Sequence, residues 1–256
     1  MAAPTNTFKQ ALIRGERQIG CWMSFAEPVT AEIMGTAGFD WLVIDGEHAP
    51  NDIRSIRDQL LALSGSPSHP VVRVPAGETW LIKMVLDAGA QTVLVPMVET
   101  AGQAQELVHA CRYPPTGMRG VGAMASRATM YGTTCDYIRT ADRQICLLVQ
   151  VESRAGLAAL DDILQIDGID GVFIGPADLS TDMGHQGNSA APEVRTAIAD
   201  ALTRIKAAGK APGILGTDDA TTQLYLEMGA QFLAVGIDVM LLARSARELA
   251  AQWKGE

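Results

Sequence analysis

The stretch GIDGVFIG at 168–175 contains the pattern that decides the fold, and this pattern returns three more times along the chain. The other copies are GFDWLVID at 38–45, GAQTVLVP at 89–96 and GAQFLAVG at 229–236. Each copy opens with a glycine and then runs through a polar residue into mostly apolar residues. The pattern is typical of a helix that ends at a left-handed glycine and turns into a buried parallel strand.

Further strand candidates lie between these copies, and amphipathic stretches such as NDIRSIRDQLLAL at 51–63 separate them. These candidates are IGCWMSF at 19–25, PVVRV at 70–74, ICLLVQV at 145–151 and APGILG at 211–216. Eight strands that alternate with helices, with no linker between them, predict a single-domain (β/α)8 TIM barrel over residues 1–256. An open doubly wound sheet is the alternative, but the GxGxxG expected after its first strand is absent.

Composition and charge narrow the class of protein. The chain is 48% hydrophobic and 19% charged, which favours one sizeable core, and its net charge is −9 with no Lys/Arg-rich run. A partner nucleic acid is therefore not expected. We also expect no signal peptide, no membrane span and, because the four cysteines are scattered without a CxxC, a reducing cytoplasmic location.

A long loop is predicted at about 112–144, and it contains the glycine- and proline-rich segment YPPTGMRGVGAMASRATMYG at 113–132. Loops of this length in compact domains are usually functional or ordered by a partner. A structurally neutral insertion is the alternative.

Polar residues gather at the predicted C-terminal ends of the strands, where (β/α)8 barrels carry their chemistry. In chain order these strand ends give Trp22, Asp45 with Glu47 and His48, Arg73, Pro96, Gln150 with Glu152, the GPAD turn at 175–178, and Gly216.

The pair Gln150 and Glu152 lies two apart on one strand, so both side chains point to the same face. Glu152 and Asp178 end neighbouring strands, and two carboxylates with no soft ligand nearby suit Mg²⁺ or Mn²⁺. The alternative is that Glu152 only pairs with Arg73 inside the barrel. The backbone N–H groups of Ala177 and Asp178 could bind a substrate carboxylate, although a proline in the first helical turn is also ordinary capping.

Arg73 interrupts an apolar strand with a cation, which could stabilise a developing enolate oxygen or form an ion pair with Glu152 or Asp45. His48 follows Asp45 by three residues, and a carboxylate there could orient its imidazole as a base. None of the five lysines falls at a predicted strand end, which speaks against a Schiff-base mechanism.

Several motifs resemble the HpcH/HpaI family of class II pyruvate aldolases, and the likeness runs nearly end to end. The motifs are FDWLVIDGEHAPND at 39–52, VVRVP at 71–75, MRGVG at 118–122, LVQVESRAGL at 148–157, GIDGVFIGPADLSTDMG at 168–184 and GKAPGILG at 209–216.

The resemblance implies a role for each matching position. Glu152 and Asp178 are expected to hold a divalent metal ion (Mg²⁺, Mn²⁺ or Co²⁺), and Gln150, Ala177 and Asp178 to contact the pyruvate unit. Arg73 is expected to stabilise the enolate, and His48 to accept the proton, with Asp45 beside it and Asp87 raising its basicity. Trp22, Leu215 and Val121 of a neighbouring chain are expected to line the aldehyde side.

The activity implied by the resemblance is reversible cleavage of 4-hydroxy-2-oxoacids, such as 4-hydroxy-2-oxoheptanedioate, to pyruvate and an aldehyde. The family also implies a homohexamer, a trimer of dimers. Two alternatives remain open: an aldolase for sugar acids such as 2-keto-3-deoxy-L-rhamnonate or 5-keto-4-deoxy-glucarate, and a barrel that binds oxoacids without turnover.

Overall fold

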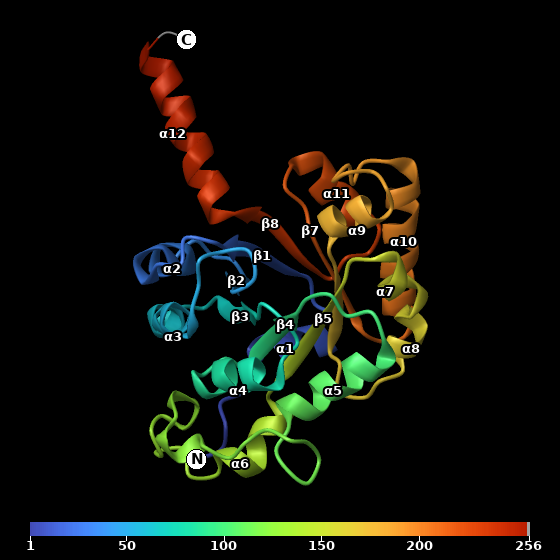
Figure 1. The fold of residues 1–256 in the computed structure, drawn as a ribbon. Coiled ribbons are helices and arrows are strands. Elements are labelled where there is room, and N and C mark those ends of the chain that lie inside the picture. Colours follow the sequence, from blue (N-terminus) through green and yellow to red (C-terminus); the bar gives the residue numbers. More distant parts are fainter. Residues whose placement is uncertain (255–256) are drawn as a thin grey trace.

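The computed structural model describes residues 1–254 and contains one closed barrel of eight parallel strands (Figure 1). Each strand pairs with the next in the sequence, and β8 pairs with β1 to close the ring. The strands are β1 (Gln18–Met23), β2 (Trp41–Asp45), β3 (His69–Arg73), β4 (Thr92–Val95), β5 (Cys146–Val151), β6 (Gly171–Ile174), β7 (Ala211–Leu215) and β8 (Phe232–Ile237). The predicted (β/α)8 fold in a single domain is confirmed.

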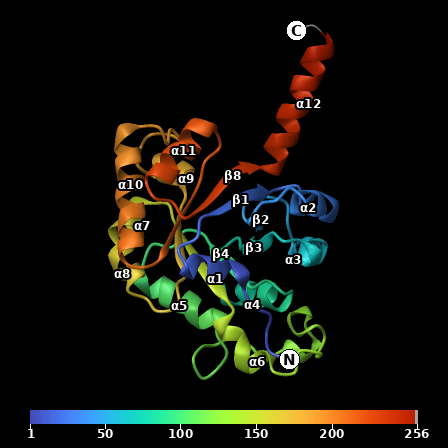
Figure 2. The ribbon, with the colours of Figure 1, turned by 180° about the vertical axis from the view of Figure 1, so that it is seen from behind.

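Helices connect successive strands and surround the barrel (Figures 1 and 2). Several begin at a side chain that accepts a backbone N–H: Asp52 and Thr100 form capping boxes at the starts of α3 and α5. The longer helices are α1 (Thr7–Ile13), α2 (Pro28–Gly35), α3 (Ile53–Ala62), α4 (Thr79–Asp87), α5 (Ala101–Cys111), α9 (Pro176–Asp182), α10 (Pro192–Ala207), α11 (Asp219–Glu227) and α12 (Asp238–Lys254). The shorter helices α7 (Arg154–Ala158) and α8 (Leu160–Leu164) follow β5.

Aromatic side chains fill the interior of the barrel. Trp41 and Phe232 are fully buried there, with ring centroids 5.7 Å apart. Glycines make room for them: a side chain at Gly20 would overlap the indole of Trp41, and one at Gly213 would overlap the ring of Phe232. The barrel interior is therefore a packed core and not an open channel.

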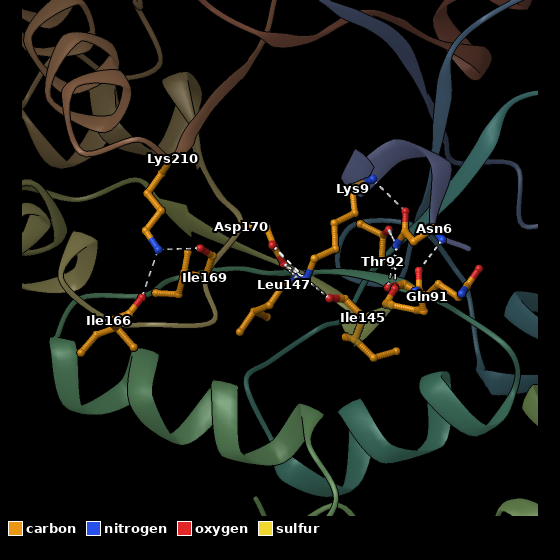
Figure 3. A network of polar contacts seen from close by, with 11 residues as sticks. Asn6, Lys9, Gln91, Thr92, Ile145, Leu147, Ile166, Ile169, Asp170 and Lys210 are labelled. Atoms are coloured by element: carbon orange, nitrogen blue, oxygen red, sulfur yellow. Dashed lines mark hydrogen bonds and ion pairs between the residues drawn. The ribbon is translucent and has the colours of Figure 1, made fainter. Parts of the chain in front are cut away.

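The N-terminal segment closes the opposite end of the barrel, where the strands begin (Figure 3). The fully buried amide of Asn6 donates to the carbonyl oxygens of Gln91 and Gln144 and to the hydroxyl of Thr92. Nearby, Lys9 Nζ lies 3.0 Å from Asp170 Oδ1. These contacts tie α1 to the residues that precede or begin β4, β5 and β6.

The predicted long loop between α5 and β5 contains only short helical turns, the longest being α6 (Tyr137–Thr140). Two arginines attach it to the helices. Arg127 donates to the carbonyl oxygens of Leu60 and Ala88, near the C-terminal ends of α3 and α4, and the fully buried Arg119 donates to Asp87 at 2.8 Å. The loop is therefore an ordered part of this chain.

The last helix, α12, extends away from the barrel and does not cover it (Figures 1 and 2). Asp238 is its one buried residue, whereas Leu242 and Leu249 are 59% exposed and Trp253 is 79% exposed. Within residues 1–254, no helix has the length and apolar character needed to cross a membrane.

Candidate active site

A cavity of about 480 Å³ opens at the C-terminal ends of the strands. Its wall contains most of the residues that the sequence places at this rim, namely Trp22, Asp45, His48, Arg73, Gln150, Glu152, Ala177, Asp178 and Leu215. The outer wall adds residues that were not predicted, among them Ser24, Ser189, Thr217 and Asp218. One face of the barrel thus brings together groups from β1 to beyond β8 that lie far apart in the chain.

Asp45 fixes Arg73 at the bottom of this cavity. Arg73 Nε and Nη2 donate to the two carboxylate oxygens of Asp45, both at 2.8 Å, and the guanidinium lies over the ring of Trp22 with 5.3 Å to its centroid. Burial acts to raise the pKa of Asp45, but the hydrogen bonds and charge of Arg73 outweigh it, and the pKa is lowered. Of the two predicted ion-pair partners of Arg73, Asp45 is confirmed and Glu152 is not.

Asp45 does not orient the imidazole of His48. Its Oδ1 instead accepts the backbone N–H groups of Glu47 at 3.0 Å and His48 at 3.3 Å. The carboxylate therefore shapes the turn that follows β2, while the side chain of His48 stays 67% exposed at the cavity.

Glu47 also belongs to this cluster, although the sequence placed it at the rim without predicting a function for it. Its Oε2 lies 2.6 Å from Arg73 Nη1 and 3.8 Å from His48 Nε2. Burial raises the pKa of Glu47, against the opposing charges of Arg73 and His48. Its place in the turn directly after β2 was the usable signal, because that turn lies at the rim where the strands end.

Gln150 near the end of β5 and Glu152 just after it both line the cavity, as their spacing of two residues predicts. Gln150 Nε2 donates to Glu152 Oε2, and the backbone N–H of Met97 donates to Glu152 Oε1 at 2.9 Å. Met97 has a φ of 55°, an unusual left-handed conformation for a residue other than glycine. Burial raises the pKa of Glu152, and the nearby charges of Asp178 and Glu47 raise it further.

Gly175 and the first turn of α9 form the wall opposite Arg73. A Cβ atom at Gly175 would overlap the carboxylate of Glu152, so a glycine is required for Glu152 to lie there. Ala177 and Asp178 follow in α9, where backbone N–H groups of the first turn have no partner within the helix. These amides and the Asp178 carboxylate line the cavity.

The donor set fits a hard divalent cation. Glu152 and Asp178 bring two carboxylates to the cavity, and Gln150 Oε1 is buried without a hydrogen-bond partner. Oxygen donors of this kind suit Mg²⁺ or Mn²⁺. Within residues 1–254, no cluster of three or more His, Cys, Asp or Glu side chains is arranged for a metal ion. A cation at Glu152 and Asp178 would therefore complete its coordination with substrate and water oxygens.

Two predicted site residues lie elsewhere in the chain. Asp87 ends α4, which runs back toward the start of β4, so it lies at the opposite end of the barrel from His48 and pairs with Arg119. Val121 is 64% exposed in the long loop. Neither lines the cavity of its own chain, so any role in catalysis requires a second chain.

Lysine is absent from the cavity wall in the described part of the chain. Lys9 and Lys210 instead lie at the opposite end of the barrel (Figure 3), where Lys210 Nζ donates to the carbonyl oxygens of Ile166 and Ile169. The cavity wall therefore offers no lysine amine that could form an imine with a substrate carbonyl.

Comparisons with known proteins identify the family of this chain. Residues 18–245 match the profile of the HpcH/HpaI aldolase/citrate lyase family. A hydroxypyruvate/pyruvate aldolase from Roseovarius nubinhibens is 61% identical over 99% of both chains, and a 4-hydroxy-2-oxo-heptane-1,7-dioate aldolase from Salmonella dublin is 52% identical over 98% of this chain and 95% of the relative. A crystal structure of a family protein from Burkholderia cenocepacia J2315 superposes with a TM-score of 0.95 at 42% identity, covering 98% of this chain and 100% of the other. This chain belongs to the HpcH/HpaI aldolase/citrate lyase family.

Proposed function

We propose that this protein is a class II aldolase that reversibly cleaves 4-hydroxy-2-oxoacids to a pyruvate unit and an aldehyde. The observation that carries the proposal is the cavity in which Arg73 and His48 face Glu152 and Asp178, with no lysine in the wall. An enolate mechanism without an imine needs a positive charge to stabilise the enolate, a base to accept a proton and carboxylates to hold a metal ion. Arg73, His48 and the pair Glu152 and Asp178 can supply these groups.

Glu152 and Asp178 are the residues that would hold the divalent cation, Mg²⁺, Mn²⁺ or Co²⁺. When bound, this ion acts as a Lewis acid that polarises the 2-oxo group of the substrate. The unpartnered N–H groups of Ala177 and Asp178 would bind the substrate carboxylate, and Gln150 would contact the same end of the substrate.

Proton transfer and enolate stabilisation fall to His48 and Arg73. In the cleavage direction, His48 accepts the proton of the C4 hydroxyl, the C3–C4 bond breaks, and its electron pair remains on the pyruvate unit as an enolate. Arg73 stabilises the oxygen of this enolate with the N–H groups that Asp45 and Glu47 leave free. A proton delivered to C3 then completes pyruvate.

The three-carbon product is proposed to be pyruvate or hydroxypyruvate, because relatives of 56–61% identity carry the name hydroxypyruvate/pyruvate aldolase. Trp22 and Leu215 line the side of the cavity where the aldehyde would leave. Succinate semialdehyde is the aldehyde to compare, since relatives of 52% identity carry the name 4-hydroxy-2-oxo-heptane-1,7-dioate aldolase.

A panel of 4-hydroxy-2-oxoacids, coupled to lactate dehydrogenase or hydroxypyruvate reductase, tests the proposal. The panel contains 4-hydroxy-2-oxoheptanedioate, 2-keto-3-deoxy-L-rhamnonate, 5-keto-4-deoxy-glucarate and the adducts of hydroxypyruvate with short aldehydes. We expect turnover that EDTA abolishes and that Mg²⁺, Mn²⁺ or Co²⁺ restores. No turnover with any substrate, together with tight binding of pyruvate, would establish a non-catalytic binding protein.

We also propose that the active protein is a homohexamer, a trimer of dimers, in which α12 packs on a neighbouring copy. The exposed Leu242, Leu249 and Trp253 support this, because a projecting helix with such side chains needs a partner surface. In this assembly, Asp87 and Val121 would reach the cavity of a neighbour. Light scattering on the full chain should give a hexamer, and Leu242→Asp/Leu249→Asp should give smaller species; a monomeric wild type would contradict the proposal.

A further inference from the structure

Glu47 is a partly buried carboxylate that the mechanism above does not use, although it lies near two groups that the mechanism does use. Its side chain is 15% exposed, and its Oε2 is 2.6 Å from Arg73 Nη1 and 3.8 Å from His48 Nε2. In the described residues, it is the one carboxylate within 4.0 Å of the His48 imidazole. It does not line the cavity itself.

The first consequence concerns the orientation of Arg73. Of the five N–H groups of a guanidinium, two are taken by Asp45, and the Nη1 group faces Glu47. The contacts with Asp45 fix the plane of the guanidinium, and the contact with Glu47 engages the one nitrogen that Asp45 leaves free. Three N–H groups, two on Nη1 and one on Nη2, are not donated to Asp45. Glu47 Oε2 lies at ion-pair distance from Nη1 but accepts no hydrogen bond within the described residues, so these N–H groups remain for an enolate oxygen.

The second consequence concerns charge. Asp45 alone already neutralises Arg73, so Glu47 adds a second negative charge to the cluster. Partial burial of Glu47 raises its pKa, and the charge of Arg73 acts in the opposite direction. Packing alone does not favour this arrangement, because buried ion pairs are often no more stable than apolar replacements of the same volume. The surrounding charges that act on Glu47 are those of Arg73, His48, Asp45 and Asp178. Of these, only His48 gains a positive charge during the proposed reaction.

We infer that Glu47 is a positioning residue for this reaction: it holds Arg73 toward the enolate oxygen and places a negative charge beside the imidazole that accepts the C4 proton. The inference rests on the proposed function. Within one chain, Glu47 is then the carboxylate that stabilises the protonated imidazole of His48. Asp87 could do this only from a neighbouring chain.

Two reactions that form the same pyruvate enolate can separate the role of Glu47 toward Arg73 from its role toward His48. Cleavage of a 4-hydroxy-2-oxoacid needs His48 to accept the hydroxyl proton. Decarboxylation of oxaloacetate breaks its C3–C4 bond with loss of CO₂ and leaves the electron pair on the same pyruvate enolate, with no hydroxyl proton to remove. Arg73 contributes to both reactions, and the base contributes only to the first.

The test is Glu47→Gln, which removes the charge but keeps the size and a hydrogen-bond acceptor for Arg73. We expect kcat for cleavage to fall about 10- to 100-fold, part of the contribution of a general base, and the decarboxylation rate to fall several-fold less. KM should change little, because Glu47 does not line the cavity. Glu47→Asp, which keeps the charge, should recover part of the cleavage rate.

The matched control is Glu16→Gln, which removes an exposed carboxylate paired with Arg14 and should leave both rates unchanged. The inference is overturned if Glu47→Gln keeps the wild-type kcat for cleavage, or if kcat, KM and decarboxylation all change in parallel with loss of thermal stability. A wild type that cleaves no 4-hydroxy-2-oxoacid would instead overturn the proposed function.

Discussion

Gly175 offers the sharpest test of how the site is built, because its missing side chain leaves the space in which Glu152 lies. An alanine Cβ at this position would be 2.8 Å from Glu152 Cβ and 3.2 Å from Glu152 Cδ, whereas non-bonded carbon atoms keep about 3.5–4.0 Å. Its backbone, with φ −87° and ψ 97°, accepts alanine. Gly175→Ala therefore forces Glu152, which supplies the three atoms nearest to the added Cβ, to move by about 1 Å.

The expected loss of function is large and the loss of stability modest. A displacement of about 1 Å at a positioned group can cost about 100-fold in rate, so kcat/KM for cleavage should fall by about two orders of magnitude. Overpacking costs typically about 1–3 kcal/mol, which for a chain of this size lowers Tm by roughly 2–10 °C.

The assay combines three measurements: pyruvate release, Mn²⁺ titration by calorimetry and thermal unfolding. Gly65→Ala is the matched control, because an added Cβ there meets nothing within 4 Å, and it should leave all three unchanged. If Gly175→Ala retains wild-type kcat/KM and Mn²⁺ affinity, the placement of Glu152 against Gly175 does not matter for the site, and the reasoning fails.

Four further predictions concern the same cluster. Arg73→Lys should lower kcat by at least about 100-fold with Tm near wild type, and a rate within tenfold would reduce Arg73 to a structural role. Borohydride added with pyruvate should leave the intact mass unchanged, and a lysine adduct would point to an imine mechanism instead. Co-expressed His48→Ala and Asp87→Asn chains should give more activity than either variant alone, because mixed oligomers would contain complete sites; activity no greater than the sum would keep Asp87 out of the neighbour's site. Burial raises the pKa of Glu152 in the folded chain above its unfolded value of 4.5. The fold is therefore most stable, with respect to Glu152, below pH 4.5, where this side chain is protonated. That stability is lost as the pH rises through the raised pKa of the folded chain. In EDTA, Glu152→Gln should therefore exceed wild type in Tm at pH 8, and this difference should shrink toward pH 4.5.

The periodicity of the sequence was sufficient to predict the barrel and most of the cavity wall. A buried strand that ends in a polar residue can place it only at the carboxyl rim, because parallel strands of a closed barrel share that rim. Arg73, Gln150 and Glu152 therefore needed no knowledge of side-chain conformation to be located there.

The partners of these side chains could not be predicted in the same way. The sequence allowed Arg73 to pair with a carboxylate from either of two strands. Arg73 contacts Asp45 and Glu47 and not Glu152, and this outcome depends on side-chain torsions that the sequence pattern does not give. Asp87 shows a second limit: the resemblance predicts that it supports His48, but within one chain it pairs with Arg119 and lies outside the cavity wall.

The N-terminal segment has a consequence for anyone who shortens or extends this protein. Backbone atoms of Met1 and Ala3 bond to Asp136 and Thr140 in the long loop, while Asn6 bonds to the residues beside β4 and β5. The first six residues thus act as a strap between the loop and the underside of the cylinder. Between Asp136 and Thr140 lies Tyr137, whose ring is 5.7 Å from the guanidinium of Arg119, the partner of Asp87. A truncation that removes this strap is therefore expected to loosen the Arg119–Asp87 pair at a distance from the cut.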